Sequence, residues 1–477
     1  MNKEPRRQPP KNKELGTRNQ EHPNSPKRIW VINPFDQLPN ETDVPLRYWA
    51  LCRTFAEQGH DVIWWSSDFS HLTKSKRPPC PDTDGFSIRL IETPPYTKNI
   101  SLARLKNHKT FANGFYNEAM TALQSGELTA PHRIVVSLPP LGVAEAAFKI
   151  RDSIHQSFLI NHQSSPPKAD QPSIITHQAP SAKPPISHQS SAISHHACQV
   201  VIEIMDAWPE TFYQALPKQF RKVLGPVLLA PLHRSAKRAY QGADKISAVG
   251  QSYLDLAQKY LGQEWKVKSE KYEGRDLSSQ ASAPAGIQEQ GTRNKELTTP
   301  THLCYHGTDL ESFAQKSETG DQNEEPGTKN NEQPLKAVYL GAMGSGYDLM
   351  TLIEVAARWK AEGQFPFQIH FAGTGSQANQ LMTHSKLLIT EERIVFHGFL
   401  QKGAINELLL SADIALVPNR PDSLVACPYK AGEYAAAGLP MLSCLGGELD
   451  NLLKQWNAGS EYEEGDAASL QAAFEKY

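Results

Sequence analysis

Apolar runs alternate with amphipathic segments from residue 28 onward. The run at 28–33 (RIWVIN) predicts a buried strand, and the apolar side chains that follow recur at helical spacing until Gly59 ends the helix. Another apolar run comes at 62–65. Further strand-like runs are found near Ile88 and at residues 133–138, 199–206 and 245–250. Because a helix between two neighbouring strands implies a right-handed crossover, this order predicts a parallel Rossmann-like sheet.

The same alternation returns near residue 335. The segment LKAVYLGAMGSGYDLMTLIEVAARW contains an apolar strand, a glycine-rich turn and an amphipathic helix that starts at about Asp348. Four more apolar runs follow, within FQIHFAGTGS, RIVFHGFL, ADIALVPN and LPMLSCLGG. We therefore expect an α/β protein of two Rossmann-like domains that face a central cleft.

Polar, low-complexity tracts interrupt this pattern, and the hydrophobic content is only 39%. We expect a disordered tail at 1–27, a first domain at 28–265 with an insertion at about 153–197, a polar linker at 266–334 around a short segment at 302–314, and a second domain at 335–477. The histidines of the insertion are irregularly spaced and have no cysteine or carboxylate beside them. This favours a polar spacer over a metal site.

The net charge of −2 gives the chain no global field for nucleic acid, so we expect no nucleic-acid partner. Six scattered cysteines without a Cys-x-x-Cys pair indicate a reducing compartment and no zinc. The amino-terminal segment lacks an apolar core of signal-peptide length, and no later segment offers 18 uncharged apolar residues. These features predict a cytoplasmic protein.

Two glycine turns of the second domain are candidates for diphosphate binding. They contain Gly341, Gly344 and Gly346 in one turn and Gly373 and Gly375 in the next. Bare backbone N–H groups at such turns can approach phosphate closely. The turns of α/β units need glycine for conformational reasons as well, so both interpretations stay open.

The segment 422–440, DSLVACPYKAGEYAAAGLP, carries the most specific pattern. It is similar to the donor-site segment of family 4 glycosyltransferases, which have the GT-B architecture, and the matching positions are Pro428, Lys430, Glu433, Ala436, Gly438 and Pro440. The resemblance implies that Glu433 binds the ribose hydroxyls of a nucleotide sugar and that Lys430 neutralises its diphosphate. We also expect Tyr347, Ser423 and Tyr429 at the donor site. The alternative is an ordinary helical ion pair between Lys430 and Glu433.

Other stretches of both halves resemble the same family. IEIMDAWPETF, with Asp206 and Trp208, looks like a segment of its acceptor-side cleft, and YHGTDLESF, with Asp309, looks like the segment before its second domain. The resemblance implies retention by front-face displacement, with no side-chain nucleophile, no metal and no cofactor besides the sugar donor. Asp206 would orient the acceptor, or it caps the helix that follows. Asp43, Arg47 and Trp208 are the expected acceptor-side residues.

Three features depart from the family pattern. Val425 stands where a carboxylate contacts the donor sugar, the turn after Gly341 lacks the basic clamp, and the chain ends at Tyr477 with little room for a final crossing helix. These departures favour an alternative function, a catalytically weakened homologue that serves as a nucleotide- or glycan-binding partner subunit. A nicotinamide enzyme is disfavoured because no Gly-x-Gly-x-x-Gly follows the first strand.

The segment 216–240 mixes basic residues with an apolar middle. Its basic residues are Lys218, Arg221, Lys222, Arg234, Lys237 and Arg238. Such a composition suits contact with an anionic membrane, although the apolar part would also suit packing on the first domain. We expect Pro226 and Pro231 to interrupt the helix here. The partners expected overall are a nucleotide sugar, a carbohydrate or lipid-linked acceptor and a peripheral membrane surface.

Overall fold

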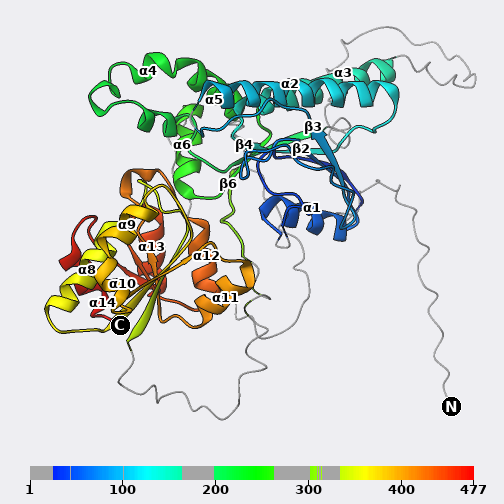
Figure 1. The fold of residues 1–477 in the computed structure, drawn as a ribbon. Coiled ribbons are helices and arrows are strands. Elements are labelled where there is room, and N and C mark those ends of the chain that lie inside the picture. The colour runs from blue at the N-terminus through cyan, green and yellow to red at the C-terminus, as the bar shows by residue number, and fades with distance from the viewer. Residues whose placement is uncertain are drawn as a thin grey trace, which may run out of the picture.

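The structure is a computed structural model that describes residues 25–42, 45–99, 101–163, 198–262, 301–308, 310, 313 and 334–477. These residues form two α/β domains, each built on a parallel sheet (Figure 1). The two predicted Rossmann-like sheets are confirmed.

The first sheet has seven strands in the order β3-β2-β1-β4-β5-β6-β7, and every neighbouring pair is parallel. The strands are β1 (Arg28–Ile32), β2 (Asp61–Ser67), β3 (Ser87–Ile91), β4 (Arg133–Leu138), β5 (Gln199–Ile204), β6 (Lys245–Ala248) and β7 (Thr301–Leu303). The range expected to be linker therefore supplies the last strand of the first domain. Three residues are too short a run for a periodicity signal, so the sequence did not reveal β7.

Helices cover both faces of this sheet. They are α1 (Arg47–Glu57), α2 (Leu102–Ser125), α3 (Leu141–Gln163), α4 (Gly225–Leu228), α5 (Ala230–Gly242) and α6 (Gln251–Leu261), with 3-10 turns η2 (Glu210–Ala215) and η3 (Lys218–Phe220). The helices α2, α3 and α5 lie together on one face, and α1 lies on the other (Figure 1). The first part of the expected insertion is helical, because α3 continues to Gln163 and its Ile154 packs against the core.

Aromatic side chains fill the space between the sheet and α2. The rings of Trp30 and Trp65 lie 5.4 Å apart, and Phe115 lies 5.2 Å from Trp65 between centroids. All three side chains are buried. Each such side chain contributes about 1.5–3 kcal/mol when it leaves water, so this cluster fixes α2 on the sheet.

The second sheet has the order β10-β9-β8-β11-β12-β13, the reversal pattern of a doubly wound fold. Its strands are β8 (Leu335–Leu340), β9 (Phe367–Ala372), β10 (Ile394–Gly398), β11 (Ile414–Val417), β12 (Met441–Ser443) and β13 (Gly459–Glu461). Its helices are α8 (Leu349–Ala361), α9 (Ala378–His384), α10 (Lys386–Thr390), α11 (Lys402–Leu410), α12 (Tyr429–Ala436), α13 (Gly447–Trp456) and α14 (Ala467–Phe474). The 3-10 turn η4 (Pro421–Ser423) precedes α12.

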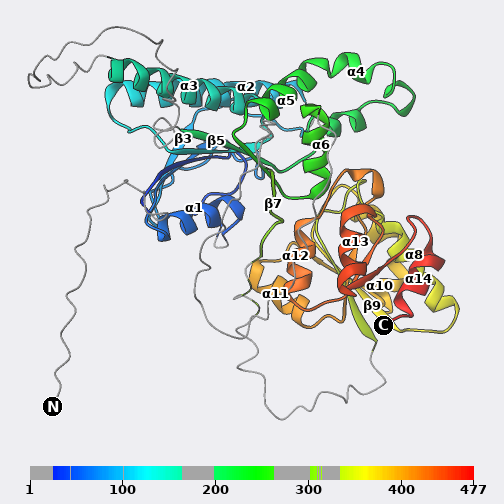
Figure 2. The ribbon, with the colours of Figure 1, turned by 180° about the vertical axis from the view of Figure 1, so that it is seen from behind.

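Each face of the second sheet carries its own core. One core joins the sheet to α8 and α14, where Phe474 lies 5.1 Å from Trp359 between ring centroids. The other joins the sheet to α11, α12 and α13. The last described helix, α14, thus belongs to the second domain. Seen from behind, β7 lies at the side of the first sheet that faces the second domain (Figure 2).

Candidate active site

The two glycine turns of the second domain pack against each other. Gly341 and Gly373 have φ of 134° and 139°, which disfavours a side chain at either position. A Cβ added to Gly373 would lie 2.0 Å from the carbonyl oxygen of Gly341, and one on Gly375 would lie 2.3 Å from that of Met343. Turn packing therefore explains Gly373 and Gly375 without a ligand.

Gly344 and Gly346 differ from those glycines. A Cβ added to either would meet no atom of the described residues within 4 Å, so the backbone here borders open space. The carbonyl of Gly346 accepts the Arg420 N–H at 3.1 Å, and the Asp348 N–H donates to Pro418 at 2.7 Å. This turn is thereby fixed to the loop after β11, and its surface is left for a ligand.

Lys430 lies in the first turn of α12, with its ammonium directed at these turns. Its Nζ lies 4.4 Å from the ring centroid of Tyr339 and 4.5 Å from that of Tyr347. A Cβ added to Gly341 would stand 3.2 Å from Nζ. The residue is only 9% exposed, and Nζ has no hydrogen-bond partner among the described residues. Burial lowers the pKa of Lys430 to about 7.

Two more buried polar groups of the β11–α12 loop lack partners among the described residues. They are the Oδ1 of Asn419 and the Oγ of Ser423. Leu424, the next residue, has a left-handed φ of 58°, which is costly for a side chain that has a Cβ. Unpaired buried polar atoms and local strain concentrate where a ligand completes the structure. The loop is therefore a candidate binding element.

Glu433 lies one turn after Lys430 and does not pair with it. Its Oε1 accepts from the Lys402 Nζ at 2.5 Å, so the helical ion pair allowed by the spacing is not formed. Lys402 begins α11, just beyond the carboxyl end of β10. In the same turn Phe399 is 74% exposed. Sequence reasoning missed Lys402 and Phe399, although an aromatic residue directly after a strand that ends in glycine was a signal.

Tyr429 contacts the segment between the domains. Its ring stacks on His306 with 3.5 Å between centroids and 28° between planes. Burial raises the pKa of Tyr429 and lowers the pKa of His306 to about 3, so both groups are neutral here. The structure thus places Tyr429 against the connecting segment, whereas Tyr347 contacts Lys430.

On the first domain, Asp206 follows β5. Its Oδ1 accepts from the Thr211 hydroxyl at 3.1 Å, and burial raises its pKa. The Ala207 backbone and the Trp208 side chain also hydrogen-bond to this carboxylate, in agreement with a capping role. Trp208 is 4% exposed and packs on Phe212, with 4.4 Å between ring centroids. The guanidinium of Arg104 lies 5.2 Å from the Trp208 ring.

Arg47 forms hydrogen bonds to the segment that follows β7. Its guanidinium pairs with Glu203 and donates to the carbonyls of Tyr305 at 3.1 Å and Cys304 at 3.2 Å. These contacts occupy the group that we expected to face an acceptor. The other expected acceptor-side residue, Asp43, lies outside the described residues, as does Asp309.

The β11–α12 loop also touches the first domain. The Gln214 amide donates to the Asp422 carbonyl, and the Tyr253 hydroxyl donates to the Leu424 carbonyl at 3.2 Å. Ala426 is buried in the core of the first domain. The candidate donor loop therefore contacts the segment after Asp206 and α6 directly.

Comparison with known proteins decides the family of the second domain. Residues 334–477 match the family model described as glycosyl transferases group 1. The second domain is a glycosyltransferase domain of this group. Together with the first domain it forms the GT-B architecture, as the sequence predicted. No curated protein matches the chain in sequence.

Solved structures share the whole fold at low identity. Sucrose-phosphate synthase from Thermosynechococcus elongatus aligns with a TM-score of 0.55 at 12% identity over 94% of this chain and 89% of its own. The catalytic domain of starch synthase IV from Arabidopsis thaliana aligns with a TM-score of 0.53 at 10% identity over 95% and 91%. The amino-terminal domain of Candida albicans trehalose-6-phosphate phosphatase gives 0.51 at 10% over 96% and 90%. Both domains of this chain therefore share the fold of these solved structures.

Proposed function

We propose that this chain transfers a sugar from a nucleoside diphosphate sugar to a glycan or lipid-linked acceptor with retention. The observation that carries the proposal is the buried, unpaired ammonium of Lys430 beside the turn that contains Gly341. An anion is the natural partner of such a group, because it offsets the cost of burying the charge. The starch synthase IV domain of similar fold was solved with ADP and acarbose. A nucleoside diphosphate suits Lys430 for the same chemical reason.

In this proposal the diphosphate lies against Lys430, the open backbone of Gly344 and Gly346, and the amino terminus of α8. That terminus adds partial positive charge where the expected basic clamp is missing. Glu433 accepts from the ribose hydroxyls and stays paired with Lys402. The exposed Phe399 offers a face on which the base stacks.

The reaction needs no side-chain nucleophile and no metal. The bond between the anomeric carbon and the diphosphate oxygen breaks, and the acceptor hydroxyl forms a bond on the same face of the sugar. Its proton passes to the departing phosphate oxygen. Charge grows on that phosphate in the transition state, and the Lys430 ammonium stabilises it. Asp206 orients the acceptor hydroxyl from the other side of the cleft.

A specific observation favours the second candidate, a nucleotide- or glycan-binding partner subunit with little activity. Val425 stands where a carboxylate would contact the donor sugar and offers none. In this case the chain binds nucleotide but turns nothing over. The two functions differ in turnover and share the donor site.

A panel of UDP-, GDP- and ADP-sugars tests the proposal by donor hydrolysis and transfer. We expect turnover with one nucleotide class and a fall of at least about a hundredfold in Lys430→Ala, since groups that stabilise transition-state charge contribute factors of that order. Glu433→Ala should also lose turnover, because it removes the ribose contact that holds the donor. Lys454→Ala is the matched control, because Lys454 is an exposed lysine of the same domain paired with Glu461. Nucleotide binding without any turnover would establish the partner-subunit function instead.

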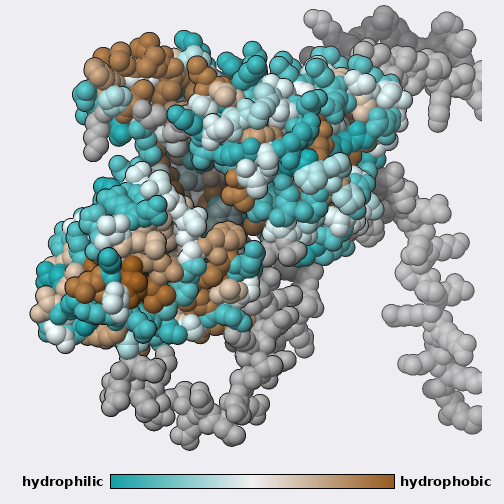
Figure 3. Space-filling model, viewed as in Figure 1, coloured by the Kyte–Doolittle hydropathy of each residue, from teal (hydrophilic) through white to brown (hydrophobic). Residues whose placement is uncertain are grey.

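Peripheral membrane contact is the second part of the proposal. Five large apolar side chains on η3, on α4 and in the turn between them are 44–72% exposed and form what we call the apolar patch: Phe220, Val223, Leu224, Val227 and Leu228. Figure 3 shows apolar side chains gathered over α4. Pro226 and Pro231 lie in the first turns of α4 and α5, so the helical segment is divided in two, as the sequence predicted.

The patch does not pack on the first domain, unlike the neighbouring Leu229, which is buried. Basic side chains border it in the turn between η3 and α4 and on α5, among them Arg221, Lys222 and Arg234. Apolar side chains beside basic ones suit the interface of an anionic bilayer. Within the described ranges no helix is long and apolar enough to cross a membrane. We therefore propose a cytoplasmic protein that touches the inner membrane face through this patch.

A further inference from the structure

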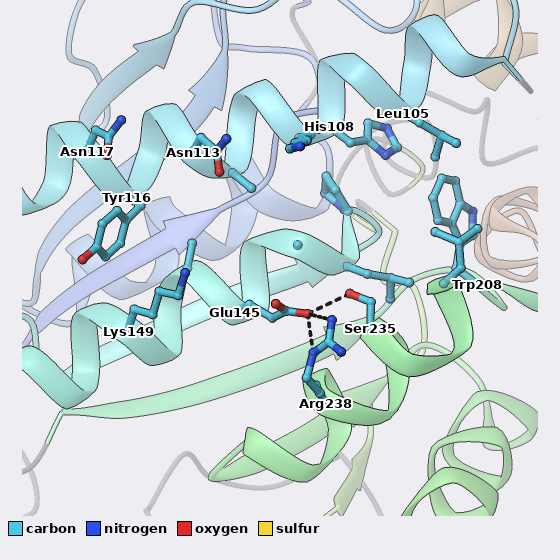
Figure 4. Close-up of a pocket in the computed structure, with 17 residues that line it drawn as sticks. Leu105, His108, Asn113, Tyr116, Asn117, Glu145, Lys149, Trp208, Ser235 and Arg238 are labelled. Carbon is cyan, nitrogen blue, oxygen red and sulfur yellow. Dashed lines mark hydrogen bonds and ion pairs between the residues drawn. The ribbon is translucent and has the colours of Figure 1, made fainter. Parts of the chain in front are cut away.

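A groove of about 620 Å³ runs between α2, α3 and α5 of the first domain (Figure 4). One end is formed by Leu105, Pro140 and Trp208, beside the carboxyl ends of the strands. The other end reaches Asn117 and Lys149, further along α2 and α3. From Leu105 to Asn117 the groove follows α2 for roughly 18 Å, at about 1.5 Å per residue. One end of the groove is lined by Trp208, which is two residues after Asp206 in the sequence. The groove is longer than one sugar ring.

The lining alternates polar and aromatic groups. Asn113, Tyr116 and Asn117 project from α2 toward the groove, and Glu145 and Ser235 line it from α3 and α5 (Figure 4). Side-chain amides offer both donors and acceptors, and aromatic rings pack against the C–H faces of sugars. A lipid chain would leave these amides without partners, which is costly. The chemistry of the lining therefore fits a saccharide.

The charges in the groove leave two cations without neutralisation. Arg238 pairs with Glu145 at 2.7 Å, and the Ser235 hydroxyl donates to the same carboxylate at 3.0 Å. Lys109 and Lys149 are exposed, and no carboxylate of the described residues pairs with them. The Lys149 Nζ lies 5.7 Å from the Tyr116 ring centroid. Burial lowers the pKa of His108 to about 3, so this imidazole adds no charge.

We propose that this groove is an extended acceptor subsite for an acidic oligosaccharide. The sugar units before the reacting one lie along α2, their acidic groups meet Lys109 and Lys149, and the reacting end lies at Trp208 beside Asp206. The inference rests on the proposed function, because it specifies the acceptor of the same site. It limits the acceptor class to chains that carry carboxylate groups.

Oligosaccharide binding tests the subsite without turnover. Hexagalacturonate and a hyaluronan hexasaccharide are titrated into the full chain by calorimetry, with maltohexaose as the neutral chain and tripolyphosphate as the anion without sugar. We expect at least one acidic chain to bind, roughly tenfold more tightly than maltohexaose, and added salt to weaken it. Binding should weaken roughly tenfold in Lys109→Ala/Lys149→Ala, since each exposed pair contributes up to about 1 kcal/mol. Lys106→Ala, on α2 but outside the groove lining, should bind normally.

Three outcomes overturn the subsite: neither acidic chain binds, Lys106→Ala loses as much affinity as the double variant, or tripolyphosphate competes as well as the saccharides. Donor hydrolysis by water separates this failure from failure of the proposed function. That reaction needs no acceptor, so Lys109→Ala/Lys149→Ala should keep it. A chain that binds acidic saccharide but hydrolyses no donor supports the subsite and refutes the enzyme.

Discussion

The buried ammonium of Lys430 lowers the free energy of unfolding of the ligand-free protein. Its pKa is about 7 in the fold, against 10.5 for an ordinary lysine. Between these values the unfolded chain keeps a proton that the folded chain has released, so the free energy of unfolding rises with pH across that window. Below about pH 7 the ammonium is charged in both states and the full destabilisation is present.

Replacing Lys430 with methionine should therefore stabilise the ligand-free protein while it abolishes turnover. We expect the free energy of unfolding to rise on the order of 1–4 kcal/mol at pH 6, with a smaller gain at pH 9. Chemical denaturation at both pH values measures the difference. Lys454→Met, on an exposed and paired lysine, should show neither gain nor pH dependence. A Lys430→Met protein that is less stable at both pH values would mean that Nζ has a partner in the apo protein.

The sequence predicted those donor-site residues that lie close together along the chain. Lys430 and Glu433 belong to one loop and one helix, so the sequence placed them together. The contact of Glu433 with Lys402, 31 residues away, depends on how β10 and β11 sit in the sheet. No local pattern encodes that neighbour, and the same reason hid the stacking of Tyr429 on His306.

At the scale of elements, α6 is capped by a side chain of the other domain. The carboxylate of Glu448, in the first turn of α13, accepts from the Gln251 N–H at 2.7 Å and the Ser252 N–H at 3.3 Å. It also accepts from the Tyr305 hydroxyl at 2.5 Å. The amino terminus of α6 carries partial positive charge, so the carboxylate both caps the helix and ties the domains.

Removing this carboxylate should open the two domains. Glu448→Ala costs about 1 kcal/mol of capping energy and leaves three donors without their acceptor. We expect a larger radius of gyration by small-angle X-ray scattering and weaker transfer activity, because the cleft must close around both substrates. Glu461→Ala removes an exposed carboxylate of the same domain and should change neither quantity. Equal scattering from both variants would show that other contacts hold the domains.

For the whole molecule, periodicity predicted both sheets but not the elements that join them. The strands of parallel sheets can be recognised in the sequence as nearly continuous apolar runs, because they are buried on both faces. β7 is three residues long and lies past a polar tract, and α3 runs on into the expected insertion. The groove between α2, α3 and α5 was equally hidden, because it arises from three helices distant in sequence. Fold class is thus readable from the chain, whereas surfaces made by assembly are not.

The apolar patch is such an assembled surface, and a bilayer can test it. Wild-type protein should sediment with vesicles of phosphatidylglycerol and less with phosphatidylcholine. Val227→Asp/Leu228→Asp should lower binding at least about tenfold, since each aliphatic side chain loses roughly 1–2 kcal/mol of burial and gains a charge that anionic lipid repels. Leu72→Asp, at another 65% exposed leucine of the first domain, is the matched control. Two outcomes would contradict a specific role for the patch at an anionic surface. Vesicle binding could be lowered as much by Leu72→Asp as by Val227→Asp/Leu228→Asp, or the wild-type protein could bind both lipids equally well. Retained vesicle binding in a turnover-dead Lys430→Ala protein would separate membrane contact from catalysis, because the two sites lie in different domains.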